Sequence, residues 1–75
     1  MIATDISVDI DSDFLYLEVE GKEYKFPIAK ISQRLLKATL AERKNFQISP
    51  SGYGIHWPMI DEDLSIPALI KSVEK

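Results

Sequence analysis

Apolar and polar residues alternate at the start of the chain. In "DISVDI" (5–10), Ile6, Val8 and Ile10 fall on one side, and Asp and Ser side chains fall on the other. A period of two residues is typical of a strand with one buried face. The polar stretch "DSD" (11–13) then predicts a turn.

Two further stretches with the same period follow this turn. Residues 14–20 ("FLYLEVE") and 23–28 ("EYKFPI") are predicted to be strands, and Gly21 between them favours a tight hairpin because it tolerates a positive φ angle. Pro27 has no backbone N–H to donate to a sheet. The third strand is therefore predicted to lie at a sheet edge or to end near this residue.

The period of the apolar residues becomes helical in the middle of the chain. Short helices are predicted over 33–38 and 40–45. Ser32 has the position of an N-cap for the first helix. Thr39 and Glu42 have the spacing of a capping box at the start of the second. The two helices are too short to predict a DNA-binding helix-turn-helix motif.

Two more strands are predicted over 45–50 ("NFQISP") and 54–58 ("GIHWP"). In the second of them, Ile55 and Trp57 fall on one face and His56 on the other. Because Trp is usually mostly buried, the first face is predicted to pack into the core.

A final helix is predicted over 65–75, with Ser65 as its N-cap and Pro67 in its first turn. The three acids at 61–63 precede it and are expected to stabilise its N-terminus. The element order is β-β-β-α(α)-β-β-α. It predicts one α+β domain over 1–75, with a small antiparallel sheet and short helices on one face.

Composition limits the class of protein. The chain has 75 residues, of which 45% are hydrophobic and 28% charged, which favours a folded domain over a disordered one. It has no Cys, no basic and apolar leader, and no apolar run of about 20 residues. We therefore expect a cytoplasmic protein without membrane association.

Charge is unevenly distributed along the chain. Residues 1–21 carry six acids and no base, whereas residues 22–44 carry seven bases and two acids. The net charge of −3 argues against direct binding of nucleic acid, which requires neutralisation of phosphates. One expectation for the basic segment is that it pairs with the acidic strands of the same chain. The alternative is that it binds a partner with local acidic charge.

Candidate chemistry centres on His56, the only His. It is a candidate general base that Asp61 or Asp63 would orient. The ordinary alternative is a solvent-facing His opposite Trp57. No nucleophile elbow or phosphate-binding Gly loop is present, and a lone His without Cys does not predict a zinc site, so we expect no metal and no cofactor. The candidate residues for a binding surface are Trp57, Tyr53, His56, Arg34 and Lys37.

Three segments carry a resemblance to a known family. They are "L-x-L-x-V-x-G-K" (15–22), "ATLAERKNFQI" (38–48) and a third over residues 52–70, of which "GIHWPxxDEDLS" is the most specific part. Together they resemble the domain of unknown function family 2442 over nearly the whole chain. Leu40 departs from the family, whose members often have Pro there. The resemblance implies a small α+β fold, a bacterial source and no established activity.

The same resemblance suggests partners. Members of the family stand alone or lie beside a DNA-binding helix-turn-helix domain, and some resemble the antitoxin-side partner of a small toxin. We therefore expect a non-enzymatic protein-interaction module with a protein partner, and a homodimer as a further expectation. The alternatives are a small hydrolase or nuclease using His56 with Asp61 or Asp63, and an accessory domain of a DNA-associated regulator.

Overall fold

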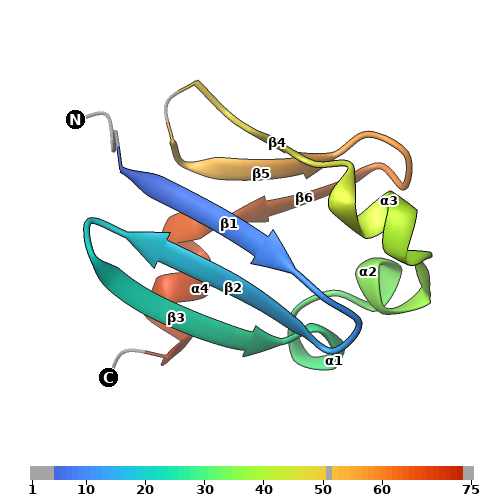
Figure 1. Ribbon diagram of the computed structural model, residues 1–75, viewed down its shortest axis with the longest axis horizontal. Coiled ribbons are helices and arrows are strands. Elements are labelled where there is room, and N and C mark those ends of the chain that lie inside the picture. Colours follow the sequence, from blue (N-terminus) through green and yellow to red (C-terminus); the bar gives the residue numbers. More distant parts are fainter. Residues whose placement is uncertain (1–4, 51, 74–75) are drawn as a thin grey trace.

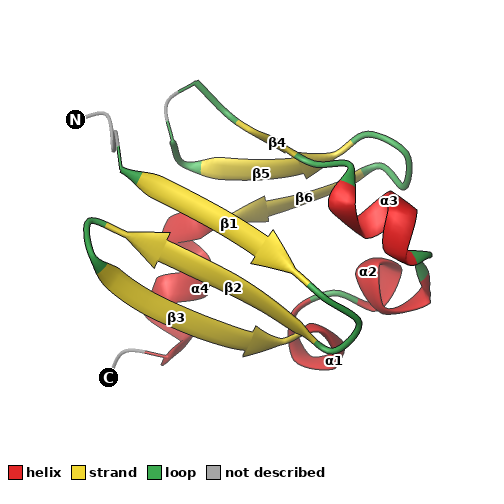
Figure 2. Ribbon diagram, viewed as in Figure 1, coloured by secondary structure: helices red, strands yellow, loops and turns green. Residues whose placement is uncertain are grey.

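The structure is a computed structural model and describes residues 5–50 and 52–73 of the chain. It contains two three-stranded antiparallel sheets and four helices (Figure 1, Figure 2). The first sheet has the order β1-β2-β3 and the second β4-β5-β6. The strands are β1 (Ile6–Ile10), β2 (Phe14–Val19), β3 (Lys22–Pro27), β4 (Gln47–Ile48), β5 (Gly54–Trp57) and β6 (Glu62–Ser65). The helices are α1 (Ile28–Ile31), α2 (Gln33–Lys37), α3 (Leu40–Lys44) and α4 (Ile66–Val73).

The α+β class and the order of the predicted strands and helices are confirmed. The structure adds β6 between the fifth strand and the last helix, and it divides the strands between two sheets. In Figure 1, α1, α2 and α3 lie together at one end of the molecule, and α4 lies behind β2 and β3. No helix in the described ranges is both long and apolar enough to cross a membrane.

The predicted hairpin between β2 and β3 has a two-residue loop. Val19 pairs with Lys22, and the intervening Glu20 and Gly21 have φ angles of 50° and 83°. Positive φ at both positions is the mark of a type I′ turn, whose twist matches that of the strands. Gly21 adopts this conformation without strain, whereas Glu20 does so at a steric cost.

The third strand ends at Pro27, and β3 is an edge strand, as the sequence predicts. Pro27 pairs with Phe14, whose backbone oxygen accepts from the N–H of Asp11, just after β1, rather than from β3. The nitrogen of Pro27 therefore faces away from the sheet, and its missing N–H costs no ladder hydrogen bond. The short helix α1 starts at the next residue, the fully buried Ile28.

Side-chain caps start the next helices where the sequence places them. Ser32 Oγ accepts from the N–H of Leu35 at 3.1 Å. Thr39 Oγ1 accepts from the N–H of Glu42, whose carboxylate accepts from the N–H of Thr39 in return, which completes the predicted capping box. These bonds satisfy N–H groups that have no partner within the helix.

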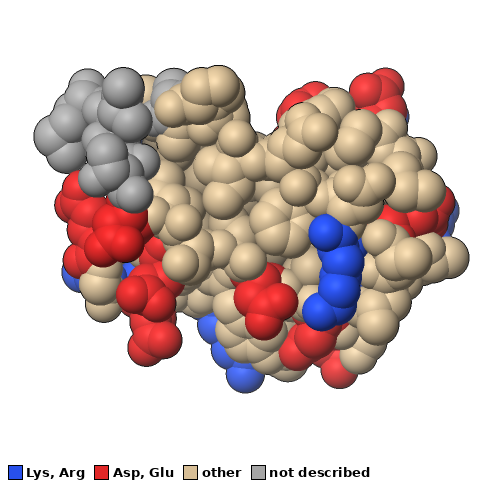
Figure 3. Space-filling model, turned by 45° about the horizontal axis from the view of Figure 1, so that its top comes forward, with Lys and Arg blue, Asp and Glu red and all other residues tan. Residues whose placement is uncertain are grey.

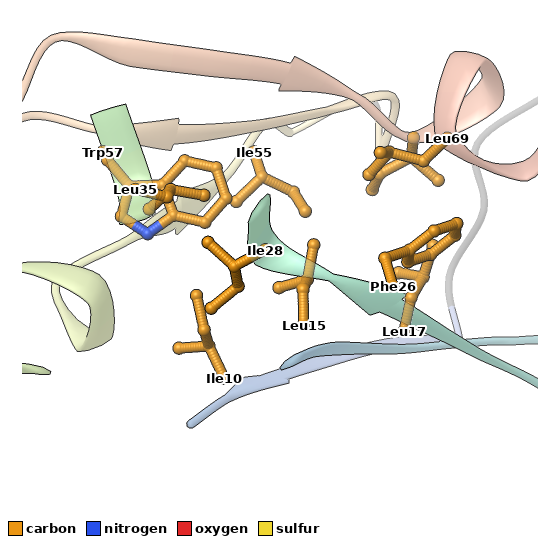
Figure 4. Packing of buried hydrophobic residues seen from close by; sticks show 10 residues of the cluster. Ile10, Leu15, Leu17, Phe26, Ile28, Leu35, Ile55, Trp57 and Leu69 are labelled. Carbon is orange, nitrogen blue, oxygen red and sulfur yellow. The ribbon is translucent and has the colours of Figure 1, made fainter. Parts of the chain in front are cut away.

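The core lies between the two sheets. In Figure 4, Ile10 and Leu15 of the first sheet point toward Ile55 and Trp57 of the second, and Leu69 of α4 closes one side. One continuous cluster of buried residues spans both sheets and the helices α1, α2 and α4. Its members are Ile10, Leu15, Leu17, Phe26, Ile28, Leu35, Ile55, Trp57, Ile66 and Leu69.

Arg43 is a buried charge that joins distant segments. Its Nε donates to the backbone oxygen of Leu35 at 2.8 Å, Nη2 donates to that of Leu36 at 2.9 Å, and Nη1 donates to that of Ser12 at 2.9 Å. The oxygen of Arg43 in turn accepts from Trp57 Nε1 at 2.8 Å. This base of the sequence's basic segment therefore stabilises the fold and does not form part of a charged surface.

The expectation that the three acids at 61–63 cap the last helix is wrong. Glu62 and Asp63 belong to β6, and α4 begins only at Ile66. Asp61 lies in the preceding turn with a φ angle of 52°, a conformation in which Asp is favoured over most residues. Ser65 caps α4, as predicted, because its Oγ accepts from the N–H of Ala68 at 3.2 Å.

Candidate functional site

His56 and Asp63 face each other on the outer side of the second sheet. They are cross-strand partners of β5 and β6, and His56 Nδ1 lies 2.7 Å from Asp63 Oδ1, a hydrogen bond when the proton is on Nδ1. Their side chains are 42% and 73% exposed. Asp63 is thus the acid that meets His56, but the pair lies on an open face that does not exclude water from a reacting group.

Asp61, the other candidate acid, has a different environment. It lies in the turn between β5 and β6, where its backbone oxygen accepts from Arg34 Nη1 at 2.6 Å. Beside this contact, Ser32 Oγ donates to Glu62 Oε2 at 2.6 Å. The two hydrogen bonds attach α2 to the β5–β6 turn, so Arg34 has a structural role, whereas Lys37 on the same helix is exposed.

Trp57 is fully buried, as the core interpretation of the sequence predicts. Its ring lies 6.1 Å from that of Phe46, and its only polar atom donates to the backbone of Arg43. Because none of its surface reaches solvent, Trp57 is not available to a partner in this structure. The expectation that Trp57 contributes to a binding surface is therefore corrected, while its neighbour His56 does face outward.

Tyr53, by contrast, lies on an apolar groove. The groove has a volume of about 330 Å³ and lies between the start of the first sheet, the turn before β5, and α4. Tyr53 is 49% exposed. The lining residues are Ile6, Val19, Gly52, Tyr53, Ile66, Pro67, Ile70 and Lys71. A groove of this size and character is at the lower limit of typical ligand pockets, about 300 Å³.

A second hollow, of about 340 Å³, lies on the outer face of the first sheet. Its charged and polar residues are Ser7, Asp9, Tyr16, Glu18, Glu23 and Lys25. Glu18 and Glu23 pair directly across the strands. Among the charged residues of its lining, three are acids and one is a base, and we refer to it as the acidic hollow.

The basic residues of 22–44 come from several elements. They are distributed over β3 and the three short helices, and the guanidinium of Arg43 is buried. Figure 3 shows the Lys and Arg side chains of one face as separate groups among uncharged and acidic residues. A DNA-associated accessory domain requires one contiguous basic face, and the face in Figure 3 does not provide it.

In the described ranges, no three His, Asp or Glu side chains lie together in a way that could hold a metal ion. Asp11 illustrates what the acids do instead. Its Oδ1 accepts from the N–H groups of Asp13 and Phe14 at 2.8 and 2.7 Å, and its Oδ2 accepts from Tyr16 Oη at 2.8 Å. These bonds hold the pKa of Asp11 below its usual value of 3.8 and raise the pKa of Tyr16 above 10.0.

Fold and surface define a small α+β protein with two antiparallel sheets and a partly open apolar groove. The chain belongs to the family described as protein of unknown function (DUF2442), whose model matches residues 5–75. A crystal structure of a protein of unknown function from Rhodospirillum rubrum is similar, with 30% identity, a TM-score of 0.72, and coverage of 96% of this chain and 87% of that chain. None of the curated proteins matches the chain.

Most residues of the apolar groove are absent from the candidates that the sequence provides. Ile6 and Val19 have the alternation of core residues, and Ile70 has the helical spacing of one. Each is only partly buried, because it lies where the core meets the surface. Periodicity identifies the face of an element but not how far the neighbouring element covers that face. Only Tyr53, whose place in a turn predicts exposure, carries a sequence signal.

Proposed function

We propose that this protein is a non-enzymatic interaction module that binds a protein partner at the apolar groove. The observation that supports the proposal is the groove itself. It has a volume of about 330 Å³, is lined mainly by apolar side chains, and lies beside the buried core. Exposed apolar concavities rimmed by polar residues are typical of interaction sites. The family resemblance suggests the specific form of the proposal, an antitoxin-like protein that binds a small toxin.

Co-expression with the product of the adjacent gene tests this function. A tagged wild-type protein is expected to co-purify with that product as a stable complex. Tyr53→Asp places a charge in the groove and should reduce the yield of the complex at least tenfold. Met59→Asp is the matched control, because Met59 is also an exposed apolar residue, at 58%, but lies on the β5–β6 turn. Equal loss with both variants, or no complex with the wild type, would contradict the proposal.

A small hydrolase or nuclease is the second candidate function, and the His56–Asp63 hydrogen bond of 2.7 Å favours it. In this mechanism Asp63 orients the imidazole, and the free Nε2 of His56 removes a proton from water. Hydrolysis of a nitrophenyl ester and of bis(nitrophenyl) phosphate by the purified protein is the test. His56→Ala should remove any such activity. Activity that survives this change would come from a contaminant or another site.

A further inference from the structure

The free edge of β1 is the starting observation. In the described residues β1 pairs with β2 on one side and with no strand on the other. The N–H of Asp11 donates to the backbone oxygen of Phe14 on β2 at 3.0 Å. Backbone groups of an antiparallel strand alternate in direction, so those of Ile6, Val8 and Ile10 face away from β2. Asp9 Oδ1 already accepts from the N–H of Ile10 at 2.8 Å, which leaves Ile6 and Val8 to present the edge.

The two faces beside this edge differ in chemistry. On the inner face, Ile6 lines the apolar groove. On the outer face, Ser7 and Asp9 line the acidic hollow. Figure 3 shows acidic side chains gathered on the left, where Figure 1 places the β2–β3 turn and the start of β1. A strand added here would have one row of side chains over apolar surface and the other over carboxylates.

A second copy of this chain does not fit the edge. The outward side chains of β1 and its flanking residues are Asp5, Ser7, Asp9 and Asp11. Antiparallel pairing of two β1 strands centred on Ser7 sets Asp5 opposite Asp9, and pairing centred on Val8 sets Asp5 opposite Asp11. Like charges directly opposite destabilise a sheet, so the acids oppose self-pairing and favour a basic strand.

The other edge of the first sheet lacks these features. The outward-facing positions of β3 are Glu23, Lys25 and Pro27, which provide one acid, one base and a residue without an N–H. Lys25 Nζ lies 4.0 Å from the centre of the Phe14 ring. An incoming strand would therefore meet neither a row of acids nor an apolar groove at β3, and the Pro would interrupt its hydrogen bonds.

We propose that β1 accepts an extended segment of the partner as a fourth strand of the first sheet, and that this segment alternates basic and apolar residues. Its apolar side chains lie opposite Ile6 and Val8 and extend over the apolar groove. Its basic side chains lie opposite Asp5, Ser7 and Asp9 over the acidic hollow. Main-chain hydrogen bonds to a sheet edge supply affinity, and alternate side chains supply specificity. This inference rests on the proposed function and specifies the partner's chemistry.

Titration of the 15N-labelled protein with a capped ten-residue peptide of alternating Lys and Val tests the inference by NMR. The amide signals of Ile6 and Val8 should shift, and their hydrogen exchange should slow at least tenfold. The same peptide with Glu in place of Lys should not bind. A peptide with five Lys followed by five Val should bind at least tenfold more weakly, because it cannot separate the two kinds of side chain between two faces. Equal binding of either control peptide would overturn the proposal.

Variants of the edge provide the matched comparison. Val8→Pro removes an outward N–H from β1 and should weaken binding of the Lys-Val peptide at least tenfold. Lys25→Pro removes an outward N–H at the other edge, together with a base and no acid, and should not weaken binding. Asp5→Asn with Asp9→Asn should weaken binding and reduce its dependence on salt. If Val8→Pro does not fold, the peptide N-methylated at alternate residues applies the same test to the wild-type protein and should not bind.

The complex with the adjacent gene's product separates this inference from the proposed function. Loss of the complex with Val8→Pro and its retention with Lys25→Pro supports strand addition. Retention with both variants, together with loss in Tyr53→Asp, leaves an interaction module and overturns strand addition. Wild-type dimers in sedimentation that disappear in Val8→Pro would show that a second copy occupies the edge, and would also overturn the proposal.

Discussion

At the scale of single residues, Arg43 links the β1–β2 turn to the end of α2. Its guanidinium donates to the backbone oxygens of Ser12, Leu35 and Leu36 and is almost completely buried. Carbonyl groups at a helix C-terminus carry partial negative charge, so a cation is favourable there. No short-range pattern in "AERKN" distinguishes Arg43 from Lys44, because the carbonyl groups that Arg43 contacts come from other segments.

Arg43→Met should lower the free energy of unfolding by about 3 kcal/mol. The change removes charge-assisted hydrogen bonds and leaves buried carbonyl groups without a donor. Urea denaturation monitored by circular dichroism provides the measurement. Lys44→Met, at the exposed neighbouring position, should change stability by no more than about 0.5 kcal/mol. A similar small effect at Arg43 would show that its hydrogen bonds are replaced by water.

Asp11 gives the β1–β2 turn a dependence on pH. Its folded-state pKa lies below the usual 3.8, because the N–H groups of Asp13 and Phe14 and the hydroxyl of Tyr16 donate to the carboxylate. A depressed folded-state pKa contributes stability that is present above the unfolded-state pKa and lost as the pH falls through the folded-state value. The stability of the wild type relative to Asp11→Asn should therefore be constant between about pH 5 and pH 9 and decline below about pH 4. A difference that does not vary with pH would contradict this account.

At the scale of elements, local signals were sufficient where the contacts are local. Ser32, Thr39 and Ser65 all act as helix caps in the structure, because a cap depends only on residues three positions away. The strand β6 could not be predicted in this way. Glu62 and Asp63 are depleted in strands generally, and here their partners are Ser32 and His56, which lie on other elements.

The His56–Asp63 pair in the candidate site also depends on contacts between elements, which local sequence patterns do not predict. The sequence reduced the acid partner to Asp61 or Asp63 but could not choose between them. The choice depends on the turn after Trp57, in which Asp61 takes a positive φ angle of 52° and the chain returns so that Asp63 lies opposite His56. This turn conformation is set by the pairing of β5 with β6, and is not apparent from the residue types at 58–61 alone.

Glu20 introduces backbone strain into the β2–β3 hairpin, and a substitution at this position can relieve it. Glu20→Asn should raise the free energy of unfolding by about 0.5–1 kcal/mol, because Asn tolerates the left-handed conformation better than Glu in a type I′ turn. Thermal or urea denaturation measures the gain. Glu20→Gln makes the same charge change at the same position without favouring the left-handed conformation, and should give no gain. Equal stabilisation by both variants would assign the effect to charge.

At the scale of the whole molecule, one core joins both sheets. Trp57, the only Trp, is buried in it and bonded to Arg43. We therefore expect a single cooperative unfolding transition, in which the fluorescence of Trp57 and the far-ultraviolet circular dichroism change at the same urea concentration. Two separate midpoints would show that the sheets unfold as independent units.

The position of the apolar groove has a consequence for tethered ligands. Ile6 at the start of β1 and Ile70 and Lys71 near the end of α4 all line it, and β1 starts and α4 ends on the same side of the molecule in Figure 1. A peptide fused beyond either element through a short flexible linker would reach the groove at an effective concentration on the order of millimolar. Fusion therefore offers a way to study occupants whose affinity is too weak to detect when they are free in solution.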